Sequence, residues 1–186
     1  MSHVIFAAAD NPLESRPNPH EKMLSVNEAI ALGKTNIHDC LLAPDFDRDK
    51  PGVMLVSDRE VVFNIDTGEI DDGALDDDFA LLSAEGCDSI YTEKEYAVYL
   101  EWNYYTEGRA QRIIDYIKQI LRHTNEVEIW RIWMGTHERP LIRTTTRFIT
   151  QLTPQDIQCL DNLTLFSDLE EQFNLPVQYR LVITKD

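Results

Sequence analysis

Asp45, Asp47 and Asp49 are spaced like the ligands in the first half of a calcium-binding loop. Such a loop also needs a glycine at its sixth position, for a sharp turn, and a glutamate at its twelfth, for bidentate ligation. In this chain the two positions hold Lys50 and Val56. We therefore expect a solvated turn here and no metal site.

His38 and Cys40 form the second group that could do chemistry, because a thiol becomes a nucleophile when a base lies close to it. No oxyanion-hole glycine motif accompanies them, and the chain has no nucleotide-binding glycine loop among its 7 Gly. We therefore expect an inert, buried Cys40. The sequence predicts no catalytic residue, no metal ligand and no cofactor, and it favours a non-enzymatic protein.

The densest run of charge extends from Asp66 to Asp78 and contains no basic residue. Such a segment repels nucleic acid and anionic membranes and attracts basic surfaces. Three interpretations are open: a solvated loop, a docking surface for a basic partner, and a group of carboxylates around a hard cation. For the docking surface, the predicted partner-binding residues are Asp66, Glu69, Asp71, Asp72, Asp76, Asp77 and Asp78.

Negative charge is concentrated in the first half of the chain. Residues 1–95 carry 21 Asp and Glu against 7 Lys and Arg, whereas residues 96–186 carry 12 against 10. Neutralisation of phosphates supplies most of the affinity of proteins for nucleic acid, so the net charge of −16 argues against a nucleic-acid partner. We expect a basic protein as the partner, and neither nucleic acid nor a membrane.

Aromatic and arginine side chains in the second half suggest a different site. Trp130, Arg143 and Arg147 are the predicted lining of a ligand pocket between the two halves. If Arg131, Arg143 and Arg147 are buried, they would instead pair with Glu101 and Glu128, which we favour because buried charges are normally paired. An exposed aromatic sheet face would otherwise stack bases or form a homodimer.

Length and composition are those of an ordinary globular protein, with 186 residues of which 43% are hydrophobic. Three distant cysteines without a CxxC pair indicate a reducing compartment. The apolar run at residues 4–9 is too short for a signal peptide, and no stretch approaches the roughly 20 apolar residues of a membrane span. We expect a soluble, cytoplasmic protein.

The second half has the pattern of a ferredoxin-like βαββαβ fold. Helices are predicted to begin at the caps Thr106 and Thr153, the second with Pro154 at its first position. This order is typical of a four-stranded antiparallel sheet with both helices on one face. The four strands are predicted at residues 96–102, 127–134, 141–150 and 177–184.

The first half is predicted to be rich in short strands. Strands are expected at residues 3–8, and at 53–57 and 60–65 joined by a tight turn. Ser25 and Glu28 form a capping box for a short helix. The expected fold class is α+β, with a ferredoxin-like half at 95–186 packed against a β-rich acidic half at 1–94.

The acidic run, the compact α+β pattern and the lack of catalytic motifs resemble small acidic bacterial proteins of uncharacterised families and, within those, immunity proteins of toxin systems. The resemblance implies a non-enzymatic protein that binds a basic partner as an immunity or inhibitor protein. Two alternatives stay open: a small-molecule-binding protein or enzyme with a pocket between the halves, and a homo-oligomeric assembly subunit such as a homodimer.

Overall fold

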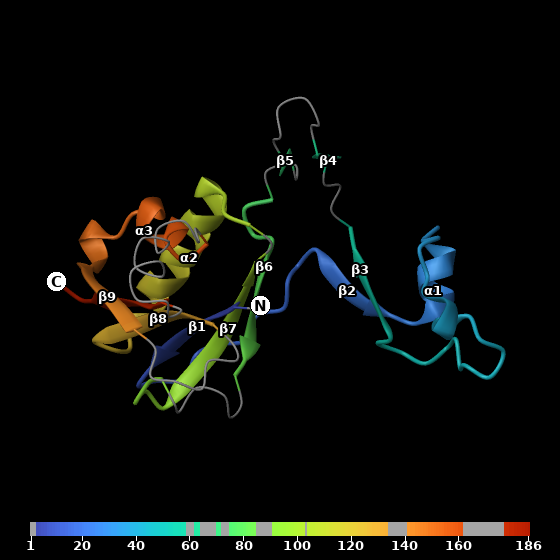
Figure 1. Ribbon diagram of the computed structural model, residues 1–186, viewed down its shortest axis with the longest axis horizontal. Helices are drawn as coiled ribbons and strands as arrows, with labels where there is room; N and C mark the ends of the chain where they lie inside the picture. The colour runs from blue at the N-terminus through green and yellow to red at the C-terminus, as the bar shows by residue number, and fades with distance from the viewer. Residues whose placement is uncertain are drawn as a thin grey trace. The chain divides into compact units, whose positions relative to one another are not determined.

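The computed structural model describes residues 3–58, 62–63, 70–71, 75–84, 91–102, 104–133, 141–161 and 177–186 (Figure 1). The chain divides into two compact units. Unit 1 comprises Met1–Pro17 and Asp76–Asp186, and unit 2 comprises Asn18–Leu75. The division therefore falls at residues 17/18 and 75/76, whereas the sequence analysis placed it at 94/95. The first strand of the chain belongs to the same unit as the C-terminal half.

A six-stranded mixed sheet forms the centre of unit 1, which confirms an α+β fold. Its spatial order is β6-β7-β1-β8-β10-β9, and all neighbours are antiparallel except β9 and β10. Strands β1 and β8 consist mostly of buried residues, as central strands do. The bounds are β1 His3–Ala9, β6 Phe79–Ser83, β7 Tyr96–Trp102, β8 Glu126–Trp133, β9 Leu141–Phe148 and β10 Val177–Thr184.

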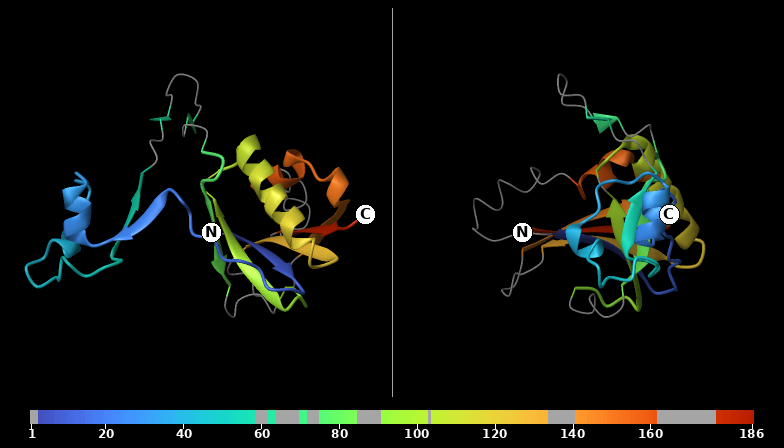
Figure 2. Two further views of the ribbon diagram at one scale, coloured as in Figure 1. Left: turned by 180° about the vertical axis from the view of Figure 1, so that it is seen from behind. Right: turned by 90° about the vertical axis from the view of Figure 1, so that its right-hand side faces the viewer.

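Helices α2 (Glu107–Ile120) and α3 (Pro154–Gln158) cover one face of this sheet, called here the helix face (Figure 2). The predicted caps are confirmed: the Thr106 side chain accepts from the Arg109 amide, and Thr153 forms a capping box with Asp156. The apolar stripe of α2 is buried as its spacing predicts. The short 3-10 helix η2 (Ile149–Gln151) precedes α3.

The order of elements from β7 to β10 is the predicted one, but the ferredoxin-like arrangement is not confirmed. Strand β1 lies between β7 and β8 and pairs with both. Strand β10 pairs with β9 in parallel, so the sheet is mixed rather than antiparallel. Because β1 comes from the N-terminus, no pattern within residues 95–186 predicts its insertion.

The second face of the sheet, called here the opposite face, carries a smaller apolar cluster. Its buried members are Phe6, Ala8, Trp130 and Ile132. The ring of Tyr91 lies 6.2 Å from that of Trp130, so the segment before β7 covers part of this face.

Unit 2 contains short elements only. The predicted capping box is confirmed at the start of α1 (Val26–Ala31), where Ser25 and Glu28 bond reciprocally. Gly33 follows this helix with a φ of 76°, a conformation that glycine adopts without strain. The other elements are β2 (Glu21–Leu24), the 3-10 helix η1 (Asp39–Leu41), β3 (Met54–Ser57), β4 (Val62–Phe63) and β5 (Ile70–Asp71).

Strand pairing in unit 2 differs from the expected tight hairpin. Strand β3 pairs with β2, about thirty residues earlier in the chain, and β4 pairs with β5. Both pairs are antiparallel two-stranded ribbons. Helix α1 packs beside β3 (Figure 1). None of the described helices of either unit is long and apolar enough to cross a membrane.

Candidate functional site

The acidic run is divided between the two units. Asp66, Glu69 and Asp72 lie outside the described residues, and Asp71 pairs through its backbone with Val62. Asp76, Asp77 and Asp78 begin the part of unit 1 that leads into β6. The three described aspartates have different surroundings.

Asp78 is buried at 1% exposure and forms an ion pair with Arg109, which is itself completely buried. The two side chains approach to 3.5 Å between Nη2 and Oδ2. Arg109 also donates to the Tyr104 carbonyl at 2.7 Å and lies over the Tyr104 ring at 4.8 Å. Because Asp78 is enclosed, its carboxylate cannot contact the surface of a partner.

Asp76 lies against the first turn of α2. A Cβ atom added at Gly108 would overlap the carboxyl group of Asp76, so the absence of a side chain at residue 108 makes room for that group. A carboxylate is favourable there because the N-terminus of a helix carries a partial positive charge. Asp77 pairs with Arg16 at 3.8 Å, with both side chains about half exposed. Of the three, Asp76 and Asp77 therefore remain accessible in part.

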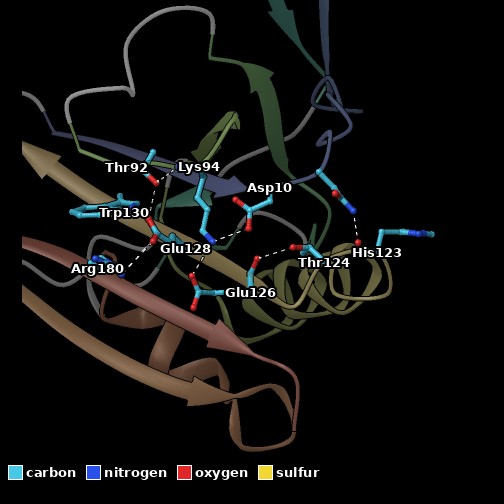
Figure 3. Close-up of polar contacts among 10 residues, drawn as sticks. Asp10, Thr92, Lys94, His123, Thr124, Glu126, Glu128, Trp130 and Arg180 are labelled. Atoms are coloured by element: carbon cyan, nitrogen blue, oxygen red, sulfur yellow. Dashed lines mark hydrogen bonds and ion pairs between the residues drawn. The ribbon is translucent and has the colours of Figure 1, made fainter.

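A second polar group lies on the opposite face of the sheet around Glu128 (Figure 3). Glu128 is 6% exposed, and its Oε2 atom accepts from Thr92 at 2.8 Å and from the Trp130 indole at 2.7 Å. Its Oε1 atom lies 3.2 Å from Arg180, whose guanidinium covers the Trp130 ring at 5.3 Å. Each oxygen of this buried carboxylate thus has a donor, so the group anchors the segment at Thr92 to β8.

Lys94 continues this polar group towards the end of β1 (Figure 3). Its ammonium contacts Asp10 at 2.9 Å and Glu126 at 3.0 Å. Burial alone would lower the pKa of Lys94, but hydrogen bonds with the two carboxylates raise the pKa above its usual value. The ammonium joins two segments of unit 1 and stays charged at neutral pH. The contacts of Lys94 thus have a structural role.

The expected pocket of Trp130, Arg143 and Arg147 does not form, because the sheet separates these side chains. Trp130 is 1% exposed and belongs to the cluster on the opposite face. Arg143 and Arg147 are in register with Tyr179 and Ile183, which point to the helix face. A tryptophan and two arginines on different faces of one sheet cannot line one pocket.

Arg147 has a partner other than the expected Glu101 or Glu128. Arg147 donates to Asp156 at 2.8 Å, which ties β9 to the first turn of α3. Burial and Asp156 raise the pKa of the Cys159 thiol, and the charges of Arg143 and Arg147 partly oppose this shift. Glu128 pairs with Arg180 and not with these arginines.

Two further expectations concern the aromatic face and Cys40. Trp130 is buried at 1% exposure and so is not exposed for stacking bases, whereas Tyr99 on the same face is only partly buried. Cys40 is exposed rather than buried, with its sulfur 3.1 Å from Nδ1 of His38. Cys40 lies in η1 of unit 2, and His38 is the N-cap residue of that element.

A hollow of about 370 Å³ lies between residues 14–17 and helix α2. The Tyr116 hydroxyl donates to the Glu14 carbonyl at 3.2 Å, and burial raises the pKa of Tyr116 to about 12. Its charged lining residues balance one another, so the hollow selects neither an anion nor a cation. These residues are Glu14, Arg16, Arg112 and Asp115.

Sequence reasoning missed Arg109 and Lys94. Lys94 is the only basic residue between Arg59 and Arg109. Lys94 and Arg109 therefore lie in an acidic region of the sequence, which makes each of them a candidate for an internal ion pair. Arg109 also precedes the apolar stripe of α2 by one residue, a position next to the core. The part of the chain that the structure describes holds no group of three or more His, Cys, Asp or Glu that could bind a metal ion.

No protein-family model, no curated protein and no solved structure matches this chain.

Proposed function

We propose that the chain is a non-enzymatic acidic protein that binds a basic protein partner. The observation that carries this proposal is the charge of unit 2, where residues 18–75 hold 12 acidic residues against 5 basic ones. Carboxylates at this density steer a positively charged partner and hold it through salt-sensitive contacts. Exposed carboxylates in the described part of unit 2 are Glu28, Asp39, Asp45, Asp47, Asp49 and Asp58.

We include the first four acidic residues of the acidic run in the proposed binding surface. Asp66, Glu69, Asp71 and Asp72 belong to unit 2 by their place in the chain. Asp76 and Asp77 are partly exposed carboxylates of unit 1, whereas Asp78 is left out of the proposal because it is buried.

A nuclease-type toxin has the chemistry that this proposal needs, since its own surface must be positive to hold nucleic acid. The protein would then be an immunity protein whose carboxylates take the place of phosphates. Cys40 and Cys159 are free thiols, which suits a reducing compartment such as the cytoplasm.

An affinity pull-down from a lysate of the native host, at low and at high salt, tests this proposal. We expect a basic protein that binds in stoichiometric amount at low salt and elutes at high salt, because salt screens exposed charges. Mass spectrometry identifies it. Binding that does not respond to salt, or the absence of any basic partner, would contradict the proposal.

Two variants with the same change in charge sharpen this test. Replacing Asp66, Glu69 and Asp72 by their amides removes three charges from the acidic run. The control replaces Glu14, Glu93 and Glu101, exposed carboxylates of unit 1, in the same way. We expect the first variant to bind the partner about tenfold more weakly and the control to change binding by about twofold or less. Equal losses would mean that only total charge matters.

A further inference from the structure

The ribbon of β2 and β3 has two different faces. Met23 and Leu55 are directly opposite each other across the ribbon, and they are 58% and 61% exposed. Val56, next along β3, is only 9% exposed and points to the other face, because side chains alternate along a strand. Of the two cross-strand faces, one is thus covered and one presents two large apolar side chains.

The described part of unit 2 buries little apolar surface. Its buried apolar residues are Val26, Ala29 and Val56, as far as the structure describes the unit. In the same segments five large apolar side chains are at least 36% exposed: Met23, Ile30, Leu32, Leu42 and Leu55. A two-stranded ribbon is marginally stable in water unless further strands or a helix cover its apolar face. The face of Met23 and Leu55 is therefore one that a partner would stabilise by covering.

Charge decides which partner fits this face. Unit 2 has a net charge of −7, and unit 1, with 21 acidic residues against 12 basic ones, has −9. A second copy of this chain would bring like charges together at this face. Glu21 lies on the same face as Met23, two residues away along β2. A positively charged partner is complementary to the net negative charge of unit 2. Apolar side chains on the same partner would cover Met23 and Leu55.

We infer that the face of Met23 and Leu55 is the docking surface for a basic protein segment that also carries apolar side chains. This inference rests on the proposed function and adds to it the place of contact and the chemistry of the partner. Charge brings the partner to unit 2, and burial of the two side chains holds it.

The test uses the full chain and two synthetic peptides of equal length and charge. One is an amphipathic peptide of lysine and leucine, and in the other serine replaces each leucine. We expect the lysine–leucine peptide to bind about tenfold more tightly in calorimetry, because only it can bury Met23 and Leu55. Equal affinities for the two peptides would overturn the inference.

Two variants assign this preference to the ribbon. The M23S/L55S variant should lose the roughly tenfold preference for the lysine–leucine peptide. The control is Phe148→Ser, which removes a side chain that is 49% exposed in unit 1, and it should keep the preference. Circular dichroism and a cooperative thermal unfolding transition like that of the wild type show that each variant is folded. A preference that survives in M23S/L55S, or that is lost in the control, would overturn the inference.

Methionine oxidation reports on the same face within the unaltered chain. Met23 should react rapidly with peroxide in the free protein and slowly with the lysine–leucine peptide bound, since oxidation follows exposure. Met54, one residue before Leu55 on β3, points to the covered face and serves as an internal control. Slow oxidation of Met23 in the free chain would show that the chain itself or a second copy covers the face, and would overturn the inference.

These outcomes separate the inference from the proposed function. If both peptides bind equally and in a salt-sensitive manner, the inference fails and the proposed function stands. If neither peptide binds at low salt, the proposed function fails as well, because even the charge-driven contact is missing.

Discussion

The two units of this chain treat their apolar side chains in opposite ways. Unit 1 contains all but three of the buried apolar residues in the described part of the chain, and it exposes three large ones, Leu82, Ile142 and Phe148. Among its described residues, unit 2 buries three apolar side chains and exposes five large ones. Unit 1 thus has a hydrophobic core on both faces of its six-stranded sheet. The described part of unit 2 has only a few buried apolar side chains.

Their charged residues differ in a corresponding way. In unit 1, charged side chains are used inside the fold, as Arg109 with Asp78 and Lys94 with Asp10 and Glu126 show. In unit 2 most described carboxylates are exposed. The buried apolar side chains indicate that unit 1 provides most of the core, and in the proposed function the exposed carboxylates of unit 2 are the surface for a partner.

The largest expected effect is a difference in stability between a core variant of unit 1 and a ribbon variant of unit 2. Trp130→Ala should lower the free energy of unfolding by about 4 kcal/mol, because it leaves a cavity among buried side chains. Leu55→Ala should change it by no more than about 0.5 kcal/mol, because the side chain is already in water. Urea unfolding followed by circular dichroism measures both. A large cost for Leu55→Ala would break the comparison, since it would show that unit 2 has a core of its own.

Two neighbouring aspartates of unit 1 test whether a buried ion pair contributes more to the free energy of unfolding than an exposed one. Asp78→Ala should destabilise the protein by about 3 kcal/mol, because it leaves the buried guanidinium of Arg109 without its carboxylate. Asp77→Ala should cost less than about 1 kcal/mol, because its pair with Arg16 is half exposed and screened by water. The same unfolding experiment compares them. Similar costs for the two variants would contradict the internal role given to Asp78.

Gly108 tests whether the Asp76 carboxylate stabilises the N-terminus of α2. Alanine normally stabilises a helix by up to about 1 kcal/mol relative to glycine. Here Gly108→Ala should instead destabilise by about 1 kcal/mol, since the new methyl group displaces the Asp76 carboxylate from the helix N-terminus. In an Asp76→Ala background the same change should become stabilising. Thermal unfolding of the four proteins forms the cycle, and additive effects would show that the two residues do not touch.

The smallest expected effect is the pH dependence that Lys94 contributes to unit 1. Because the pKa of Lys94 is raised in the folded state, its stabilisation is complete below the unfolded pKa of about 10.4 and is lost as pH rises through the folded value. Relative to wild type, Lys94→Met should therefore remove about 0.5 kcal/mol of stability at pH 8 and less at pH 11. Urea unfolding at the two pH values checks this sign. A deficit that grows with pH would contradict it.

Local patterns in the sequence predicted much of the secondary structure. The caps Ser25, Thr106 and Thr153 begin the helices that they were expected to begin. The predicted strands of the second half are present within a few residues of their expected bounds. These features depend on residues three or four apart or on alternation, so neighbouring residues contain the information.

Those local patterns did not predict which strands pair when they are far apart in the sequence. β1 inserts between β7 and β8, and β3 pairs with β2 instead of with its neighbour β4. The side-chain partners followed from these pairings, so Glu128 pairs with Arg180 and Arg147 with Asp156. The sequence allows many pairings of opposite charges, and the register of the strands decides which pairing forms.

The sequence by itself therefore determined the α+β class, the helix starts and the excess of acid in the first half of the chain. Only the tertiary structure decided which acidic residues are internal and which are exposed, because burial depends on contacts between distant segments. Asp77 and Asp78 are adjacent and identical in type, yet one is half exposed and the other is enclosed by Arg109. The strand that follows and the helix against which it packs make that difference.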